Sequence, residues 1–323
     1  MQTTADTVVI TRAVPGEPVE VSGATVRHGP AEAATRAELL AMVPGARVIV
    51  SMFSDRIDEE AIDAAGPGLA GVCNFAVGYN NIDLDACQRR GVVVTNTPDA
   101  VTEGTANIAI GLLLAVARRI VEGDRMVRTG GWAAAAPLAM GDMLGVDLAG
   151  RTLHIIGAGR IGYATALRAA AFGMRVIYSS RRPKPVFEQA PLAAERVALE
   201  DGLRRADVVS LHTPLTDETR HLLDARRLAM LNPGAIVINT SRGPVIDEAA
   251  LVDALRAGRL HGAGLDVFED EPELCEGLAE LTSVVMTPHI GSAEHRWRHE
   301  MTRMCERAAA AIIAGREPEH RVI

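Results

Sequence analysis

Short apolar runs recur along the chain, and most of them are followed by a segment whose apolar residues repeat at helical spacing. In the first part of the chain, strands are predicted at residues 7–11, 47–52, 71–76 and 92–95, with helices near 36–42, 58–65 and 84–90. Farther along, strands are predicted at residues 151–156, 174–179, 207–211, 235–239, 263–267 and 283–286. Strands that alternate with helices predict parallel sheets covered on both faces. We therefore expect an α/β protein with doubly wound sheets.

Two prolines mark the places where the chain is expected to pass between domains. Pro98 precedes a helix-start pattern, and Pro288 follows the last predicted strand. A helix near residues 294–314 would then pack back on the first domain. We expect a discontinuous substrate-binding domain (residues 1–99 and 288–323) and a dinucleotide-binding domain (residues 100–287), each Rossmann-like or flavodoxin-like. The two crossings would form a hinge beside an active-site cleft.

A glycine-rich loop follows the predicted strand at 151–156. It reads GxGxxG, and its residues are Gly157, Ala158, Gly159, Arg160, Ile161 and Gly162. The first glycine permits a tight turn, the second lets the backbone approach a pyrophosphate, and the third allows close packing of helix on strand. The pyrophosphate would meet the amides at the start of the helix, near Arg160. Because a helix and a second strand follow, the loop predicts dinucleotide binding.

The strand that follows this helix indicates which dinucleotide is preferred. An acidic residue about 20 positions after the glycine loop normally binds the ribose hydroxyls and repels a 2′-phosphate. Here the segment 178–182 contains no acid, and it ends in Arg181 and Arg182. Two guanidinium groups can bind a phosphate dianion through charge-assisted hydrogen bonds. We expect NADP(H) to be preferred, whereas a solvent-exposed basic loop would accept NAD(H) as well.

Composition narrows the classes of function. The chain has 323 residues, is 48% apolar and has a net charge of −8 without a concentrated basic stripe, so neither nucleic acid nor a membrane surface is an expected partner. Its four cysteines form no CxxC pair, which fits a reducing cytoplasm. The start of the chain lacks a secretory pattern, and the most apolar stretch, 108–116, is too short to cross a bilayer.

Three segments that follow predicted strands supply an arginine, a carboxylate and a histidine, namely Arg242, Glu271 and His289. Because the carboxyl ends of parallel strands meet at one edge of a sheet, we expect these side chains to converge. Reduction of a 2-oxo acid needs a cation for the substrate carboxylate, a proton donor at the carbonyl oxygen and an acid that supports the donor. Each residue alone also fits an ordinary loop position. Their combination with the glycine loop favours catalysis.

The sequence predicts no metal site. His295 and His299 lie four residues apart on a predicted helix and would face one side of it. The HExxH pattern is absent, however, and the neighbouring Arg296 and Arg298 suit a solvated face.

Nearly the whole chain resembles the D-isomer-specific 2-hydroxyacid dehydrogenases, and among them the glyoxylate and hydroxypyruvate reductases. The matching stretches are residues 10–12, 76–83, 94–98, 144–145, 157–162, 212–216, 239–243, 265–268 and 287–293. The resemblance implies that Arg242 binds the substrate carboxylate and polarises the carbonyl. It also implies that His289 donates the proton and that Glu271 hydrogen-bonds the imidazole and favours its charged form.

The resemblance implies further contacts. Val77 and Gly78 match a loop whose backbone amides bind the substrate carboxylate. Asp266 matches the residue that orients the nicotinamide carboxamide, and Ser180 stands where an acid commonly binds the ribose. The segment 121–148 matches the arm through which relatives form two-fold dimers, so a homodimer is expected. The other positions that match cofactor-lining residues are Thr213, Thr240 and Gly291.

We therefore expect an NAD(P)H-dependent oxidoreductase that reduces glyoxylate or hydroxypyruvate to the D-2-hydroxy acid. A 2-ketogluconate-type reductase is the nearest alternative. A relative that oxidises formate or phosphite would share the glycine loop, but the asparagine and the extended N-terminal region of formate dehydrogenases are not found. A nucleotide-sensing scaffold of the co-repressor type would retain a similar site, although the sequence lacks the disordered tails that favour such a role.

Overall fold

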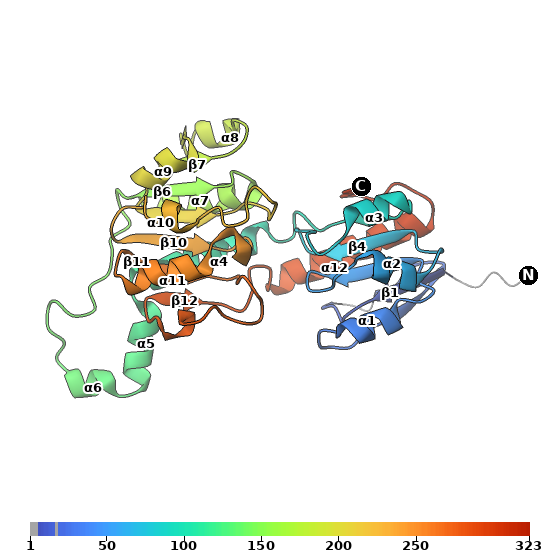
Figure 1. Ribbon diagram of the computed structural model, residues 1–323, viewed down its shortest axis with the longest axis horizontal. Coiled ribbons are helices and arrows are strands. Elements are labelled where there is room, and N and C mark those ends of the chain that lie inside the picture. The colour runs from blue at the N-terminus through green and yellow to red at the C-terminus, as the bar shows by residue number, and fades with distance from the viewer. Residues whose placement is uncertain (1–5, 17–18) are drawn as a thin grey trace, which may run out of the picture. The chain divides into compact units, whose positions relative to one another are not determined.

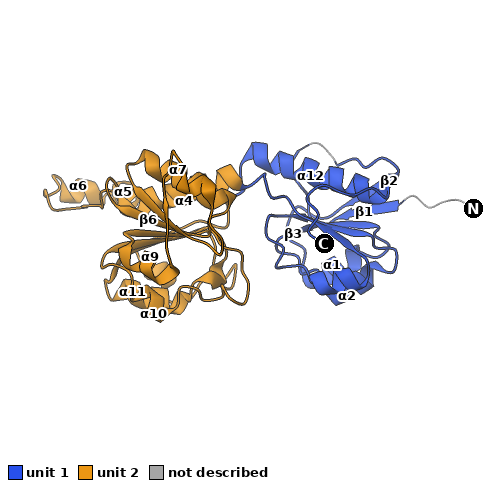
Figure 2. Cartoon of the chain, turned by 90° about the horizontal axis from the view of Figure 1, so that it is seen from above, with its two compact units in different colours: residues 1–101, 292–323 blue, residues 102–291 orange. Residues whose placement is uncertain are grey.

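The computed structural model describes residues 6–16 and 19–323, and the chain forms two compact units (Figures 1 and 2). Unit 1 comprises residues 1–101 and 292–323, and unit 2 comprises residues 102–291. The sequence placed the two crossings at residues 99–100 and 287–288. Each unit holds one parallel sheet, so the expectation of an α/β fold with two parallel sheets is confirmed.

Unit 1 contains a five-stranded parallel sheet in the order β2-β1-β3-β4-β5, which is the flavodoxin-like strand order. Strands β3 and β4 are buried at every position, which explains why their sequences are mostly apolar. Strand β2 was not predicted, because it is an edge strand whose side chains are mostly exposed. The strands are β1 (Asp6–Ile10), β2 (Ala24–His28), β3 (Val48–Met52), β4 (Gly71–Phe75) and β5 (Val93–Thr95).

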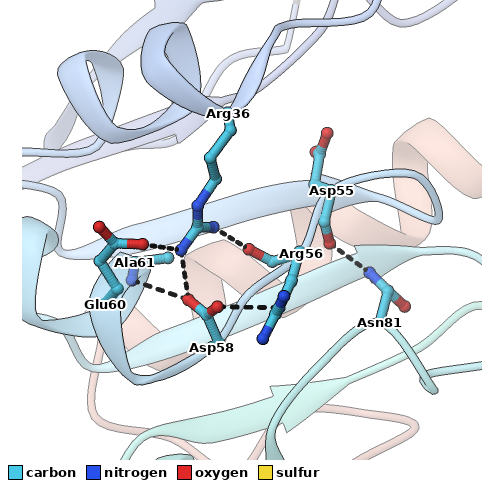
Figure 3. A network of polar contacts seen from close by, with 7 residues as sticks. All are labelled: Arg36, Asp55, Arg56, Asp58, Glu60, Ala61 and Asn81. Carbon is cyan, nitrogen blue, oxygen red and sulfur yellow. Dashed lines mark hydrogen bonds and ion pairs between the residues drawn. The ribbon is translucent and has the colours of Figure 1, made fainter.

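Short helices α1 (Arg36–Met42), α2 (Glu59–Ala65) and α3 (Leu84–Arg89) connect these strands. Asp58 caps α2 by accepting a hydrogen bond from the amide of Ala61 at 3.2 Å, and it pairs with Arg36 of α1 at 2.5 Å (Figure 3). This shared acid ties the starts of α1 and α2 together.

The C-terminal helix α12 (His295–Ile313) packs on β4 and β3 of unit 1, as the sequence predicts. Its approach is close, since a Cβ atom at Gly71 would lie 2.6 Å from Ile312 Cδ1. Beyond α12, the chain end pairs antiparallel with β5, where the amide of Val322 donates to the carbonyl of Val94 at 2.7 Å. The tail therefore covers an edge that would otherwise expose unpaired backbone groups.

Unit 2 contains a seven-stranded parallel sheet in the order β12-β11-β10-β9-β6-β7-β8. Helices α4 (Thr102–Ala117) and α7 (Arg160–Ala171) lie on one face, and α9 (Leu199–Arg205), α10 (Ala225–Leu228) and α11 (Glu248–Arg256) lie on the other (Figure 2). A short helix, α8 (Pro185–Glu188), precedes β8. The strands are β6 (Thr152–Ile156), β7 (Arg175–Ser179), β8 (Glu195–Arg196), β9 (Val208–Leu211), β10 (Ala235–Asn239), β11 (Leu260–Leu265) and β12 (Val284–Met286).

One strand prediction in unit 2 was displaced. The apolar run at 263–267 predicted a strand that in fact spans β11, Leu260–Leu265. Val267 is buried although it lies in the loop after β11, so its apolar character extended the predicted strand too far. The loop itself is important, because it carries Glu271.

Helices α5 (Ile120–Arg128) and α6 (Gly131–Ala135) extend away from the sheet of unit 2 (Figure 1). Neither helix contains a buried residue, and Trp132 is 51% exposed. In the described part of the chain, no single helix has the length and apolar character needed to cross a membrane. Helices α4 and α5 have that length and apolar character only when they are taken together, and the pair is bent by 65° where the helices meet.

Candidate active site

The arginine, the carboxylate and the histidine predicted from the sequence lie on three consecutive loops of unit 2. Arg242 follows β10, Glu271 follows β11 and His289 follows β12. These three strands are neighbours in the sheet and run parallel. Their carboxyl ends therefore meet at one edge, as expected for ligand-binding loops of an open α/β sheet.

Glu271 and His289 form a hydrogen-bonded pair. The Nδ1 atom of His289 lies 2.8 Å from Oε2 of Glu271, and the second carboxylate oxygen accepts the amide of Phe268 at 3.0 Å. Burial favours a raised pKa for Glu271, but the hydrogen bond and charge of His289, the amide of Phe268 and the charge of Arg242 together outweigh it and lower that pKa. Glu271 is thus an anion that can accept a hydrogen bond from Nδ1–H of His289. The side chain of His289 remains 24% exposed and that of Glu271 30% exposed, so a ligand can reach them.

The loop that carries His289 is held by a buried carboxylate, that of Asp266, which is 1% exposed. It accepts hydrogen bonds from the hydroxyl of Thr287 at 2.6 Å and from the amides of Ile290 and Gly291 at 2.8 Å each. Burial raises the pKa of Asp266, and these hydrogen bonds oppose the rise. The backbone of His289 has φ of 51°, a left-handed conformation that needs such support. In this structure Asp266 therefore positions the histidine loop, and its contact with a nicotinamide stays a prediction.

Arg242 is held by the backbone of its own turn. Its Nη1 donates to the carbonyl of Ser241 at 2.7 Å, and the amide side chain of Asn239 donates to the carbonyl of Arg242 at 2.9 Å. Burial lowers the pKa of Arg242, and the charge of Glu271 opposes that change. The next residue must be glycine, because a Cβ atom at Gly243 would lie 1.8 Å from the carbonyl carbon of Phe268. The loops that carry Arg242 and Glu271 are therefore in direct contact.

The glycine loop has the geometry that dinucleotide binding requires. Gly157 has φ of +101°, and a Cβ atom there would lie 2.5 Å from the carbonyl oxygen of His212. A Cβ atom at Gly162 would lie 2.5 Å from the carbonyl oxygen of Gly157. Gly159 begins α7 without a side-chain cap, so the first amides of the helix point toward a prospective anion. These features fit a pyrophosphate, and Arg160 and Ile161 lie at the helix start.

Two hydroxyls near this loop are buried without a hydrogen-bond partner among the described residues. They belong to Thr213, after β9, and Thr240, after β10. Buried polar atoms are rarely left unsatisfied, so each hydroxyl is suited to a ligand that supplies the missing partner. Both residues were expected from the resemblance to line the cofactor.

At the end of β7, the structure adds an arginine that the sequence did not single out. Arg196 of β8 donates to the carbonyl oxygens of Ser180 at 3.0 Å and Arg181 at 3.1 Å. The Ser180 hydroxyl donates to the carbonyl of Arg182 at 2.6 Å. Arg196 therefore fixes the backbone that presents the two predicted phosphate-binding arginines. Strand β8 has two residues, which is too short to give a detectable pattern.

A second histidine–glutamate pair braces the loops that carry Arg242 and Glu271. His221 Nε2 lies 2.5 Å from Oε1 of Glu269, and the His221 amide donates to the carbonyl of Pro244 at 2.8 Å. The amide of Glu269 donates to the buried carboxylate of Glu248 at 2.7 Å. The sequence analysis did not identify these residues, because each interaction joins positions that are distant in the chain.

Not all predicted site residues belong to unit 2. Val77 and Gly78 lie in unit 1, on the loop after β4, whereas the other predicted site residues lie in unit 2. The sequence predicted no metal site at His295 and His299. Both residues lie on α12, where their rings are arranged edge to face with centroids 6.5 Å apart. Among residues 6–16 and 19–323, no group of three or more metal-binding side chains is assembled.

Comparison with known proteins identifies the family. Residues 110–291 match the family described as D-isomer specific 2-hydroxyacid dehydrogenase, NAD binding domain. A glyoxylate reductase from Thermococcus kodakarensis is 45% identical over 316 residues, which cover 96% of this chain and 94% of the relative. The crystal structure of TT0316 protein from Thermus thermophilus is 44% identical, with a TM-score of 0.89 and coverage of 98% of this chain and 100% of that chain.

A third comparison includes bound ligands. The NADPH-dependent glyoxylate/hydroxypyruvate reductase from Sinorhizobium meliloti, in complex with NADP and malonate, is 31% identical, with a TM-score of 0.86 and coverage of 99% of this chain and 97% of that chain. The fold, the glycine loop and these similarities agree. The chain therefore belongs to the D-isomer specific 2-hydroxyacid dehydrogenase family and is an NAD(P)-dependent oxidoreductase that reduces 2-oxo acids.

Proposed function

We propose that this protein reduces glyoxylate to glycolate, and hydroxypyruvate to D-glycerate, with NADPH as the preferred hydride donor. The observation that carries the proposal is the pair of Glu271 and His289 on loops next to that of Arg242. The identity of 45% to a glyoxylate reductase supports the choice of substrate. The fit of the glycine loop to a pyrophosphate supports the choice of a dinucleotide.

The three side chains divide the work of the reduction. Arg242 binds the carboxylate of the 2-oxo acid and draws electron density toward the carbonyl oxygen. When bound beside the glycine loop, the reduced nicotinamide would supply a hydride to the carbonyl carbon. His289 gives its Nε2 proton to the carbonyl oxygen, which becomes the hydroxyl of the product. Glu271 stabilises the charged imidazole before that transfer and keeps Nδ1–H directed away from the substrate.

The domains have separate roles in this proposal. Unit 2 binds the dinucleotide through the glycine loop and the hydroxyls of Thr213 and Thr240. Gly291 and Asp266 hold the histidine loop at the end of the nicotinamide site. As a separate part of the proposal, the backbone amides of the Val77–Gly78 loop bind the substrate carboxylate. We also propose a homodimer formed through the arm at residues 121–148.

The preference for NADPH rests on the end of β7. Ser180 supplies no negative charge there, and the backbone pinned by Arg196 presents two exposed arginines to a 2′-phosphate. A reductase that is 31% identical was solved with NADP bound. The proposal is tested by measuring kcat/KM with NADPH and with NADH for a panel of 2-oxo acids. The absorbance of the reduced nicotinamide reports the rate. Lack of turnover with glyoxylate and hydroxypyruvate, combined with turnover of 2-ketogluconate, would replace the proposed substrate class.

A substitution at Ser180 tests the cofactor preference alone. Ser180→Asp places a carboxylate where it can accept the ribose hydroxyls and repel a 2′-phosphate. We expect the ratio of kcat/KM for NADPH to that for NADH to fall at least tenfold. Ser180→Asn is the matched control, because it has the same shape without the charge. Equal ratios in the Asp and Asn variants would show that charge at this position does not select the cofactor.

A further inference from the structure

Two asparagine side chains hold the loop that contains Val77 and Gly78. Asn96, just after β5, donates from Nδ2 to the carbonyl oxygen of Val77 at 2.8 Å. Asn74, at 0% exposure in β4, donates from Nδ2 to the carbonyl oxygen of Gly78 at 2.8 Å. Two successive carbonyl groups are thus fixed by separate side-chain amides. All of these groups belong to unit 1.

Fixing these carbonyl groups also fixes two amides. In a trans peptide unit the C=O and the following N–H point in opposite directions. The carbonyl of Val77 therefore sets the direction of the Gly78 amide, and the carbonyl of Gly78 sets that of the Tyr79 amide. Within residues 6–16 and 19–323, neither amide donates to a protein acceptor. Tyr79 is 40% exposed, so the loop surface is open to a ligand.

The orientation of Asn74 is itself determined by its neighbours. Its Oδ1 accepts the hydroxyl of Ser51 at 3.1 Å, and this bond requires Nδ2 to face the loop. Asn74 and Asn81 also exchange amide hydrogen bonds of 3.3 and 3.4 Å. Asn81 donates in turn to the carbonyl oxygens of Met52 at 3.0 Å and Asp55 at 2.9 Å, and Figure 3 shows the contact with Asp55. A chain of amide groups therefore connects the end of β3 to the loop.

We propose that Asn74 and Asn96 are positioning residues for substrate binding, because they hold the backbone of the Val77–Gly78 loop, whose amides, that of Gly78 among them, bind the carboxylate of the 2-oxo acid. This inference rests on the proposed function. Successive backbone N–H groups form a favourable site for an anion. If either peptide unit rotated, a carbonyl oxygen would face the carboxylate and repel it. The asparagines prevent that rotation without contacting the substrate.

Asn96 is the better position for a test, because it is half-buried whereas Asn74 is fully buried. Asn96→Leu removes the donor without adding charge, and Asn96→Asp places a carboxylate beside the Val77 carbonyl. We expect both variants to raise the KM for glyoxylate and the inhibition constant of oxamate at least tenfold. Because the dinucleotide loop is in unit 2, the Kd for NADPH should stay within twofold. If Asn96 had a purely structural role, the KM for glyoxylate and the inhibition constant of oxamate would not change independently of the Kd for NADPH.

Asn232→Asp is the matched control. Asn232 also donates from Nδ2 to a backbone carbonyl, that of Ala206, at 3.0 Å, but it lies in unit 2 away from the proposed site residues. We expect this variant to lower the temperature of unfolding while the KM for glyoxylate stays unchanged. Asn74→Ser is a second variant at the proposed site, and it should raise the same KM and inhibition constant.

The outcomes separate the two proposals. Wild-type protein that neither reduces a 2-oxo acid nor binds oxamate would overturn the proposed function and this inference with it. Normal wild-type reduction of glyoxylate, together with folded Asn96 variants of unchanged KM and inhibition constant, would overturn this inference alone. An increase in KM for Asn96→Asp but not for Asn96→Leu would also contradict it, because the effect would then come from added charge.

Discussion

At the scale of single residues, the pair of Glu271 and His289 defines the first prediction. His289→Ala removes the proton donor but leaves the glycine loop and the end of β7 intact. We expect kcat to fall by a factor of about 10² to 10⁴, the range typical of general acid catalysis. The Kd for NADPH, measured by fluorescence titration, should stay close to that of the wild type. Activity equal to the wild type would show that another group supplies the proton.

Asp266 is the subject of a second prediction, because the structure shows it holding the histidine loop, whereas the nicotinamide contact implied by the resemblance stays a prediction. Asp266→Asn keeps one acceptor but turns an amide toward one of the three donors that the carboxylate satisfies. We expect the histidine loop to loosen, so that kcat falls at least tenfold and hydrogen exchange of residues 287–291 increases. The Kd for NADPH should change by less than threefold.

The opposite pattern would favour the other role. If Asp266→Asn weakens NADPH binding strongly and leaves hydrogen exchange of the histidine loop unchanged, the main contact of Asp266 is with the nicotinamide carboxamide.

The placement of Arg242, Glu271 and His289 on neighbouring loops could be predicted because each follows an apolar strand, and parallel topology brings such positions to one edge. The support around them could not be predicted. Asp266 accepts amides from a loop more than 20 residues away, and Asn96 reaches a carbonyl 19 residues before it. Such contacts depend on the separation of backbone segments after folding, and no local spacing in the sequence encodes that separation.

At the scale of elements, burial on both faces decides which strands were predicted. Strand β10 is buried throughout, and its predicted bounds match those of the structure, Ala235–Asn239. Strands β2 and β8 lie at sheet edges with mostly exposed side chains, so their sequences lack an apolar run. The apolar pattern of a sequence reflects burial rather than backbone pairing. It therefore does not predict a strand that is paired but has exposed side chains.

The first turn of α11 yields a third prediction. Glu248 is 3% exposed, and burial raises its pKa from 4.5 to about 6. An acid with a raised folded-state pKa costs stability once it ionises, so the cost grows as pH rises from 4.5 to 6 and is complete above 6. A shift of this size corresponds to about 2 kcal/mol in the free energy of unfolding.

Glu248→Gln removes the titrating group, and its carbonyl oxygen can still accept the amide of Glu269. We expect the free energy of unfolding of the variant, minus that of the wild type, to increase by about 2 kcal/mol between pH 4.5 and pH 7.5. Urea denaturation at both pH values measures this change. A difference that is independent of pH would mean that burial does not perturb the ionisation of Glu248.

At the scale of the whole molecule, the alternation of strands and helices was sufficient to predict two parallel sheets, and unit 1 has the flavodoxin-like strand order. The arm of unit 2, residues 121–148, has exposed apolar side chains that packing within a single chain does not explain. Trp132 is 51% exposed, Leu144 is 65% exposed and Met140 is 95% exposed. A hollow of about 250 Å³, lined in part by Val121 and Leu144, adjoins the edge strand β12.

Exposed apolar groups gathered on one segment favour burial against a partner, and a two-fold dimer buries the same surface on both subunits. We expect the wild-type protein to be a dimer by light scattering, and the double variant Trp132→Glu with Leu144→Glu to be a monomer at micromolar concentration. Each substitution would place a carboxylate in an apolar interface without a counter-charge, which strongly opposes association. Phe172→Glu is the matched control, because Phe172 is 43% exposed but lies outside the arm. Loss of the dimer in this control, or its persistence in the double variant, would show that the arm is not the interface.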